Sequence, residues 1–315
     1  MEHALHLYHQ SADLLAKEVR ARAPQRQVIA LKTIDELTGA LPDVSVLLTA
    51  IPPREGWARA RRLALIQLLG VGAEMLLPSF DLPPSVEVAT LRGVFAAEVA
   101  EHVIAMTLAL IRALPTLTNR QRAHDWTQFA SGTLAKKTIG IVGLGAIGRR
   151  IARVAHAFDA RVLATRRVAS SPVPFVEREY AAGDLDEMLR ESDVVVVCLP
   201  KTPTTTRLFD RTRLLGLKQG ALLVNVARGG IVDEAALLEV LGNGHLGGAA
   251  IDVFAEEPLA AASALWNAPN TIVTPHIAGW GLDYLGRGVD VFLENVSRLE
   301  ANAPRVGLVD REAGY

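Results

Sequence analysis

The chain has 315 residues, of which 50% are hydrophobic and 21% are charged, and its formal net charge at pH 7 is −1. This length and composition predict a globular protein of two domains and exclude intrinsic disorder. Because the charge is almost balanced, no general nucleic-acid surface is expected, and the one basic cluster, Arg54–Arg62, is interpreted as a solvated helix face.

Cysteine usage and hydropathy predict a soluble cytoplasmic protein. Cys198 is the only cysteine, so no disulfide can form within the chain, which fits a reducing compartment. The segment Met1–Gln10 lacks the long apolar core of a secretory signal, and charged residues interrupt the most hydrophobic helix, Val94–Leu114. We therefore expect no association with a membrane. The N-terminal histidines His3, His6 and His9 have no acidic or thiol partner, so no metal site is predicted.

The first hundred residues alternate short apolar strands with helices. This alternation predicts a parallel sheet covered on both faces. A long helix from about Ala97 to Leu114 follows and is expected to end before Pro115. The predicted strands are Ala4–Tyr8, Gln27–Leu31, Val44–Thr49, Leu63–Leu69 and Val86–Thr90, and the predicted helices are Ala12–Ala23 and Trp57–Arg62.

A second alternating unit begins at Thr138. Asp184-x-x-Glu187 resembles a capping box, and Asp233 is expected to open a helix that ends at Gly242–Gly244. After the last strand, a helix from about Leu282 to Glu300 is predicted to return to the first unit. The predicted strands are Thr138–Val142, Arg161–Thr165, Val194–Leu199, Ala221–Val226, Ala249–Val253 and Thr271–Thr274.

These elements predict an α/β protein of two Rossmann-like or flavodoxin-like domains with parallel sheets and an active site in the interdomain cleft. Residues 1–97 plus 282–315 are expected to form the substrate-binding domain. Residues 98–281 are expected to form the dinucleotide-binding domain.

The strand Thr138–Val142 runs directly into Gly143-x-Gly145-x-x-Gly148, and a helical pattern and a second strand follow. This is the order that a dinucleotide fingerprint requires. The first glycine permits a tight turn, the second lets the backbone approach a pyrophosphate, and the third allows close packing of helix and strand. The diphosphate then lies against free N–H groups at the positive end of the helix.

The end of the second strand indicates which dinucleotide is used. Enzymes that use NAD place an acidic residue about 20 residues past the fingerprint to bind the adenosine ribose. Here that place holds Thr165, Arg166 and Arg167, and the next carboxylate is Glu177. A guanidinium binds a 2′-phosphate through charge-assisted hydrogen bonds, whereas a carboxylate repels it. We therefore predict NADP, with NADPH preferred over NADH; the alternative is that both arginines lie on a solvated loop.

Three downstream segments each place a chemically capable residue just beyond a strand. Arg228 follows Ala221–Val226, Glu257 follows Ala249–Val253, and His276 follows Thr271–Thr274. Ligands of open parallel sheets bind beyond the carboxyl ends of the strands. We therefore expect a guanidinium, a carboxylate and an imidazole to face one crevice.

The motifs Val226-Ala227-Arg228-Gly229, Asp252-Val253-Phe254 with Glu257-Pro258, and Pro275-His276 follow the glycine fingerprint. With it, they resemble the D-isomer-specific 2-hydroxyacid dehydrogenases. The resemblance runs from Gly70-Val71-Gly72 to the C-terminus and is densest from Val99-Ala100-Glu101-His102 to Gly279. The glyoxylate/hydroxypyruvate reductases look most similar, because the arginine pair replaces the ribose-binding acid.

The resemblance implies a role for each of these residues. Arg228 would hold the carboxylate of a 2-oxo acid, His276 would act as general acid, and Glu257 would be its partner, favouring the imidazolium. Asp252 would help to hold the nicotinamide amide. Substrate-binding residues would be Val71, Gly72, Arg228 and His276, and cofactor-binding residues would be Gly143, Gly145, Ala146, Ile147, Gly148, Thr165, Arg166, Arg167, Leu199, Pro200, Thr206, Val226, Ala227, Asp252 and Gly279.

The predicted function is the NADPH-dependent reduction of a small 2-oxo acid, such as glyoxylate or hydroxypyruvate, to the (R)-2-hydroxyacid. One alternative is an NAD-linked dehydrogenase acting on a phosphoglycerate-like or phenylpyruvate-like substrate. Another is a dinucleotide-sensing corepressor of the C-terminal-binding-protein type. By resemblance the protein would be a homodimer joined through the helix Ala97–Leu114, and Trp126 would be either a dimer contact or core.

Overall fold

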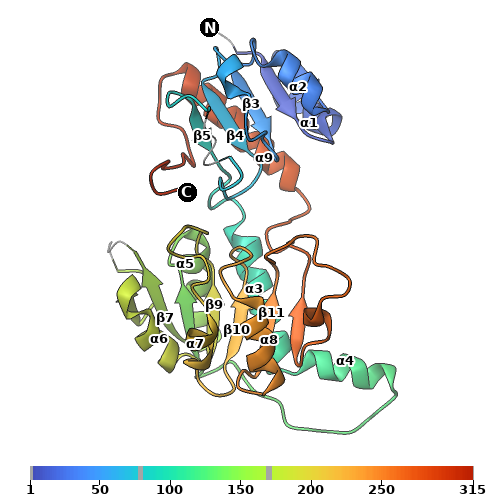
Figure 1. The fold of residues 1–315 in the computed structure, drawn as a ribbon, viewed down its shortest axis with the longest axis vertical. Coiled ribbons are helices and arrows are strands. Elements are labelled where there is room, and N and C mark those ends of the chain that lie inside the picture. The colour runs from blue at the N-terminus through green and yellow to red at the C-terminus, as the bar shows by residue number, and fades with distance from the viewer. Residues whose placement is uncertain (1–2, 77–80, 168–171, 315) are drawn as a thin grey trace. The chain divides into compact units, whose positions relative to one another are not determined.

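The computed structural model describes residues 3–76, 81–167 and 172–314, and the contacts of the chain divide it into two units (Figure 1). Unit 1 comprises Met1–Val94 and Gly281–Tyr315, and unit 2 comprises Phe95–Trp280. Unit 1 therefore contains both ends of the chain. The predicted domain boundaries fall close to the unit boundaries, while the roles assigned to the two domains stay predictions.

Unit 1 contains a five-stranded parallel sheet in the order β2-β1-β3-β4-β5. This is the strand order of flavodoxin-like folds. The central strands β3 and β4 are buried along their whole length, as expected when helices cover both faces of a parallel sheet. The strands are β1 (Leu5–Tyr8), β2 (Val28–Leu31), β3 (Val46–Thr49), β4 (Leu65–Leu68) and β5 (Glu87–Ala89).

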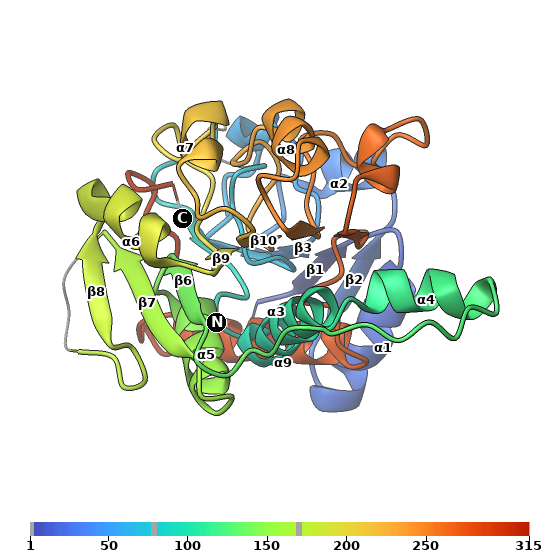
Figure 2. The same cartoon turned by 90° about the horizontal axis from the view of Figure 1, so that it is seen from below.

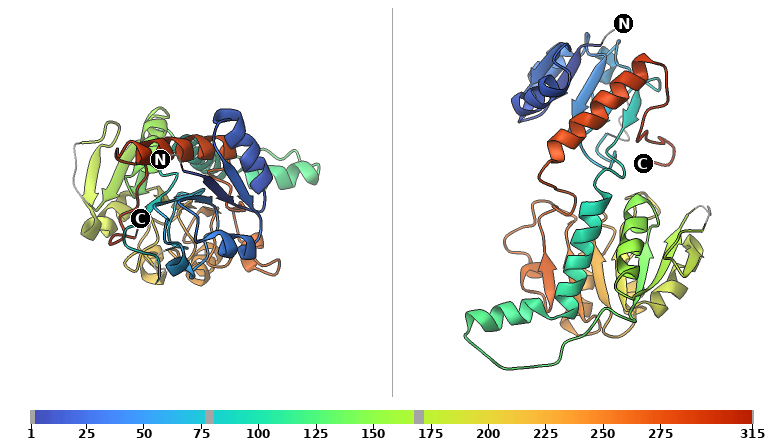
Figure 3. Two further views of the ribbon diagram at one scale, coloured as in Figure 1. Left: turned by 90° about the horizontal axis from the view of Figure 1, so that it is seen from above. Right: turned by 180° about the vertical axis from the view of Figure 1, so that it is seen from behind.

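The helices of unit 1 lie on both faces of this sheet. Helices α1 and α9 lie side by side on one face, and α2 lies on the other (Figures 2 and 3). The buried amide of Asn295 on α9 donates from Nδ2 to Gln67 Oε1 of β4 at 2.8 Å, which fixes the C-terminal helix to strands from the start of the chain. The helices are α1 (Ala12–Arg22), α2 (Ile34–Ala40), α9 (Tyr284–Glu300) and the 3₁₀ turn η1 (Trp57–Arg59).

Unit 2 contains a seven-stranded parallel sheet in the order β12-β11-β10-β9-β6-β7-β8. The chain runs outward from β6 in both directions, so the strand order reverses between β6 and β9. This is the arrangement of dinucleotide-binding sheets, in which the ligand lies at the point of reversal. The strands are β6 (Thr138–Val142), β7 (Arg161–Arg166), β8 (Arg178–Ala181), β9 (Val194–Val197), β10 (Leu222–Asn225), β11 (Gly248–Ile251) and β12 (Thr271–Val273).

Two apolar cores lie on opposite faces of this sheet. Helices α3 and α5 cover one face, and α6, α7 and α8 cover the other (Figures 1 and 2). The prediction of two α/β units with parallel sheets is confirmed. The helices are α3 (Ala96–Ile111), α4 (Leu114–Arg122), α5 (Ala146–His156), α6 (Leu185–Glu191), α7 (Arg211–Leu215) and α8 (Glu234–Gly242), with 3₁₀ turns η2 (Ala182–Asp184) and η3 (Ala264–Asn267).

Three helix predictions were wrong in detail. The segment predicted as a helix from Trp57 to Arg62 forms only the 3₁₀ turn η1, Trp57–Arg59. The long helix ends at Ile111, where Ala113 takes a left-handed φ of 54°, and Pro115 lies in the first turn of a separate helix, α4. Proline is accommodated there because the first-turn N–H groups have no partner within the helix. Helix α6 begins after Asp184, but that side chain makes no capping hydrogen bond. Asp233 does cap α8, accepting from the N–H groups of residues 235 and 236 at 3.1 Å.

Among the described residues, no helix is both long enough and apolar enough to cross a membrane.

Candidate active site

The loop between β6 and α5 follows the predicted fingerprint closely. A Cβ at Gly143, whose φ is +110°, would lie 3.0 Å from the carbonyl oxygen of Cys198, and a Cβ at Gly148 would lie 2.2 Å from the carbonyl oxygen of Gly143. Both positions therefore require glycine within the protein itself. They bring the end of β6, the start of α5 and the end of β9 into close contact.

Gly145 differs from the other two glycines. A Cβ at Gly145 would meet nothing within 4 Å, and the residue is exposed at the N-terminus of α5. No side chain caps that helix, and its first turn contains no acidic residue. Open space beside uncapped N–H groups at a helix N-terminus fits the pyrophosphate of a dinucleotide. The fingerprint residues thus fit the cofactor that the sequence predicts.

The end of β9 forms the other side of the reversal point. The Cys198 thiol donates to the carbonyl oxygen of Gly143 at 3.1 Å. The residue as a whole is half-buried, but its sulfur is desolvated, and this raises the pKa of the Cys198 thiol to about 12. Leu199 is half-buried, Pro200 is exposed, and the Thr206 hydroxyl donates to the carbonyl oxygen of residue 202 at 2.9 Å. This segment is therefore an ordered turn beside the fingerprint loop.

The three residues at the end of β7 have different surroundings. Thr165 is buried, and its carbonyl oxygen accepts from the N–H groups of Gly143 and Leu144 at 3.3 and 3.0 Å, so its backbone holds the fingerprint loop. Arg166 forms an ion pair with Glu179 of β8, and these side chains are 13% and 20% exposed. Arg167 is exposed. The two arginines therefore differ in exposure, and Arg166 is held by a carboxylate.

Arg228 lies just beyond β10 on a turn whose backbone is tightly held. The buried Asn225 accepts the N–H of Ala227 through Oδ1 at 3.2 Å, and Arg228 is half-buried, with Nη1 donating to the carbonyl oxygen of Ala227 at 2.7 Å. A Cβ at Gly229 would come within 1.6 Å of the carbonyl oxygen of Phe254. The Arg228 turn and the segment after β11 are therefore in direct backbone contact.

His276 and Glu257 are joined by a hydrogen bond. His276 Nδ1 lies 2.7 Å from Glu257 Oε2, and Glu257 Oε1 accepts the N–H of Phe254 at 2.9 Å. The carboxylate is thus anchored at one oxygen and holds the imidazole with the other. Because Nδ1 faces the carboxylate, Nε2 is the ring nitrogen left to meet a substrate.

The carboxylate of Asp252 organises the loop that carries His276. Its Oδ1 accepts from the Thr274 hydroxyl at 2.6 Å and from the N–H of Ile277 at 2.9 Å, and its Oδ2 accepts from the N–H of Ala278 at 3.0 Å. Between them His276 has a φ of 53°, a left-handed conformation that costs a non-glycine residue roughly 1–2 kcal/mol. The bonds to Asp252 hold this turn. The prediction that Asp252 binds the cofactor amide is untested.

The predicted substrate-binding residues of unit 1 lie in the segment after β4. Val71 and Gly72 are both half-buried there. In unit 2, Phe95 is only 2% exposed, whereas Trp280 is 70% exposed. The fingerprint, Arg228, Asp252, Glu257 and His276 all belong to unit 2. The site between the domains stays a prediction.

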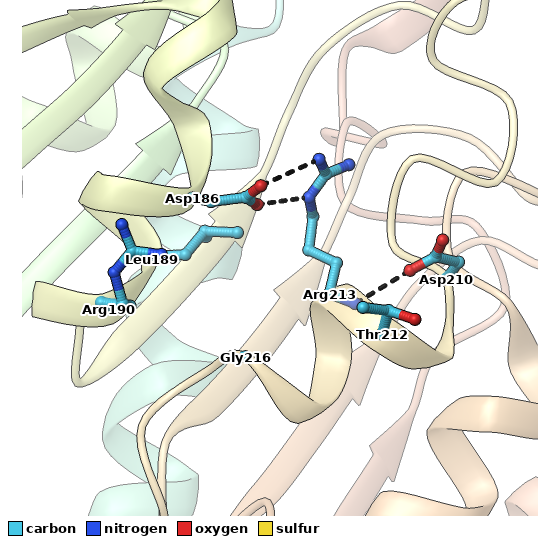
Figure 4. Close-up of a pocket in the computed structure, with 7 residues that line it drawn as sticks. All are labelled: Asp186, Leu189, Arg190, Asp210, Thr212, Arg213 and Gly216. Carbon is cyan, nitrogen blue, oxygen red and sulfur yellow. Dashed lines mark hydrogen bonds and ion pairs between the residues drawn. The ribbon is translucent and has the colours of Figure 1, made fainter.

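A separate pocket of about 260 Å³ lies between α6 and α7 (Figure 4). The Arg213 side chain lies across the pocket and donates from Nε to Asp186 Oδ1 at 2.6 Å. The backbone N–H of Arg213 donates to Asp210 Oδ1 at 2.8 Å. None of the predicted site residues lines this pocket. The ion pair between Arg213 and Asp186 joins α7 to α6 across the pocket, which indicates a structural role.

Within residues 3–76, 81–167 and 172–314, no three His, Cys, Asp or Glu side chains gather as they would around a metal ion. His6 is buried on β1, and burial lowers its pKa.

Comparison with known families assigns the chain independently of these contacts. A family model described as D-isomer specific 2-hydroxyacid dehydrogenase, NAD binding domain, matches residues 104–278. The matched range contains the fingerprint loop and the segments that carry Arg228, Glu257 and His276.

Relatives and solved structures agree with that match. D-3-phosphoglycerate dehydrogenase of Mycobacterium bovis is 36% identical over 256 residues, 77% of this chain and 47% of that protein, so the chain spans about half the length of this curated relative. The structure of a D-isomer specific 2-hydroxyacid dehydrogenase from Xanthobacter autotrophicus Py2, in complex with NADPH and MES, aligns over all of both chains with a TM-score of 0.91 and 32% identity. An NADPH-dependent glyoxylate/hydroxypyruvate reductase from Sinorhizobium meliloti, in complex with NADP and sulfate, aligns over 99% of this chain and 100% of its own, with a TM-score of 0.89 and 27% identity.

Sequence reasoning missed three contacts near the predicted residues. These are Glu179 on Arg166, Thr274 on Asp252, and His102 of α3 on Thr274. His102 ends the motif Val99-Ala100-Glu101-His102, and Thr274 directly precedes Pro275-His276. The family resemblance could therefore have drawn attention to both residues. Glu179 had no such signal, because its strand has no apolar pattern.

Replacing Gly229 by alanine tests the backbone contact. The added Cβ would overlap the Phe254 carbonyl, so we expect Gly229→Ala to destabilise the protein by about 2–3 kcal/mol, measured by urea unfolding. Gly242→Ala is the matched control, because a Cβ there meets nothing within 4 Å and lies at the end of α8. An unchanged unfolding midpoint for Gly229→Ala would contradict the contact.

Thiol labelling tests the environment of Cys198. A pKa of about 12 leaves almost no thiolate at pH 8, so a disulfide reagent should label the folded protein at least roughly 100-fold more slowly than the urea-unfolded protein. Folding raises the pKa of the Cys198 thiol from 9.0. The contribution of the neutral thiol to the free energy of unfolding is therefore fully present below pH 9.0 and is lost as the pH rises toward 12. Equally rapid labelling of both forms would refute this environment.

Proposed function

Because the chain belongs to the D-isomer-specific 2-hydroxyacid dehydrogenase family, we propose that it reduces a small 2-oxo acid to the (R)-2-hydroxyacid. The observation that carries this proposal is the hydrogen bond between His276 Nδ1 and Glu257, in the same unit as a glycine loop that fits a dinucleotide. That combination would supply a proton donor in the same unit as the bound cofactor.

The cofactor supplies the hydride, and the protein supplies position and a proton. The open face at Gly145 and the N-terminus of α5 would hold the pyrophosphate. Leu199 and Pro200 would line the opposite side of the reversal point, together with Val226 and Ala227 at the end of β10.

His276 is assigned the proton that reaches the carbonyl oxygen of the substrate. With Nδ1 bound to Glu257, Nε2 is the donor, and the anchored carboxylate stabilises the imidazole in that orientation. Arg228 is assigned the substrate carboxylate, because a guanidinium matches a carboxylate with two parallel hydrogen bonds. The contact of Gly229 with Phe254 links the Arg228 turn to the segment whose N–H anchors Glu257.

For the substrate we propose glyoxylate or hydroxypyruvate, with Val71 and Gly72 as further substrate-binding residues. The reductase from Sinorhizobium meliloti supports this assignment through its overall similarity, and the phosphoglycerate dehydrogenase of Mycobacterium bovis supplies the main competitor. The cytoplasmic location of the protein stays a prediction, which is based on its single cysteine.

For the cofactor we propose NADPH in preference to NADH. The similar structures that contain NADPH or NADP support this choice, as does the absence of a carboxylate from residues 165–167. We assign the 2′-phosphate to the arginines at the end of β7, Arg166 and Arg167, because a guanidinium binds a phosphate through charge-assisted hydrogen bonds.

For the quaternary structure we propose a homodimer formed through α4 and the segment after it. Helix α4 has no buried residue and projects from the body of unit 2 (Figure 1). A groove of about 1410 Å³ lies between α3, α4 and residues 124–131. Beside it, Leu114, Leu117 and Phe129 are 40–47% exposed and Trp126 is 92% exposed. Exposed apolar side chains beside a groove favour burial against a second copy.

A substrate panel tests the proposed reaction. NADPH oxidation should occur with glyoxylate and hydroxypyruvate, and His276→Asn should lower kcat about 100-fold or more, because general acid catalysis contributes about 10²–10⁴-fold. His156→Asn, an exposed histidine of α5, is the matched control. Tight NADPH binding without turnover of any 2-oxo acid would contradict the proposal and favour a dinucleotide sensor.

Cofactor preference is tested at Arg167. Loss of a guanidinium from the 2′-phosphate should lower kcat/KM for NADPH about 10–100-fold in Arg167→Ala, with little effect for NADH. Arg153→Ala, an exposed arginine of α5, serves as control. A strong NADH preference in the unmodified protein would overturn this reading of Arg166 and Arg167.

The dimer is tested by light scattering on a sizing column. We expect a homodimer at about 10 μM, and a monomer for Leu117→Glu with Trp126→Ser, because the two changes remove apolar area from the proposed interface. Phe158→Ser, which alters an exposed aromatic outside that groove, should stay dimeric. A monomeric unmodified protein would disprove the interface.

A further inference from the structure

A half-buried imidazole on α3 has no part in the proposed hydride and proton transfer. His102 lies on α3, its side chain is 15% exposed, and its Nε2 lies 3.2 Å from the Thr274 hydroxyl oxygen. Burial lowers its pKa, with the charge of Asp252 acting in the opposite direction. The neutral ring is therefore favoured.

The direction of the hydrogen bonds follows from counting protons. The Thr274 hydroxyl has one proton, and it is donated to Asp252 Oδ1 at 2.6 Å. The contact of that hydroxyl with His102 is then a hydrogen bond only if Nε2 of His102 carries the proton. A chain of donors thus runs from His102 through Thr274 to Asp252.

Asp252 in turn is the partner of three successive N–H groups in the His276 loop. Its carbonyl oxygen accepts from His276 at 2.9 Å, and its carboxylate accepts from Ile277 and Ala278. Any rotation of the Asp252 carboxylate therefore moves the left-handed turn that carries His276. The carboxylate is 2% exposed, so bulk water offers little substitute for a lost donor.

We propose that His102 and Thr274 are positioning residues that lock the Asp252 carboxylate and thereby hold His276 in its productive orientation. The inference rests on the proposed function in that His276 is the proton donor. In this proposal His102 acts on His276 through the Thr274 hydroxyl and the Asp252 carboxylate.

Paired substitutions test the donor chain. Thr274→Val keeps the shape of the side chain and removes the hydroxyl, whereas Thr274→Ser keeps the hydroxyl. His102→Leu removes the donor, whereas the amide of His102→Gln retains one. Glu101→Gln, an exposed neighbour on α3, is the control for changes on that helix.

The first readout does not depend on activity. Amide hydrogen exchange at Ile277 and Ala278 should be about 10-fold faster in Thr274→Val and His102→Leu, and unchanged at the Val224 amide of β10, because only the loop loosens. Unchanged exchange at Ile277 and Ala278 would overturn the proposed link, whatever reaction the protein catalyses.

The second readout is kinetic. In Thr274→Val and His102→Leu, kcat for the 2-oxo acid should fall about 10-fold while KM for NADPH stays within about twofold, because misplacement of a catalytic group affects the chemical step. Thr274→Ser and His102→Gln should retain kcat. Faster amide exchange with an unchanged kcat would overturn the positioning role. So would a loss of kcat that parallels a fall in the midpoint of urea unfolding. An unmodified protein that reduces no 2-oxo acid would instead refute the proposed function, leaving the exchange result to decide the link.

Discussion

The site depends on one backbone contact, the approach of Gly229 to the carbonyl oxygen of Phe254, which leaves no room for a Cβ. Phe254 is the centre of a short segment that touches every reactive group. Its N–H holds one oxygen of Glu257, whose other oxygen holds His276, and Asp252, two residues earlier, holds the His276 loop. These contacts join the segments after β10, β11 and β12 to one another, as a site with a precisely placed proton donor requires. The rigidity that a positioned proton donor needs is therefore built into unit 2 itself.

Much of the fold was predictable, because buried parallel strands are continuous apolar runs that few other structures produce. The edge strand β8 was missed, since only Tyr180 of its four residues is buried and the rest of its pattern is polar. Helix α2 was missed although its capping box at Thr33 and Glu36 was readable. The split between α3 and α4 depends on the left-handed conformation of Ala113, which an alanine does not signal.

The site was predictable where its reactive residues lie directly beyond the carboxyl ends of strands. The pairing of Glu257 with His276 follows from placing both beyond adjacent parallel strands, β11 and β12, and the structure brings the two together. The different surroundings of Arg166 and Arg167 were not predictable, because they depend on Glu179 in a strand that the hydrophobic pattern does not reveal. The contact from His102 to Thr274 joins residues 172 positions apart, and no local pattern encodes such a distance.

The most direct test of the account is a crystal structure with NADPH and oxamate, a non-reacting isostere of a 2-oxo acid. The oxamate carboxylate should bind the Arg228 guanidinium, and its carbonyl oxygen should lie within hydrogen-bond distance of His276 Nε2. Oxamate bound away from both side chains, or an imidazole whose Nε2 faces away from the carbonyl, would contradict it.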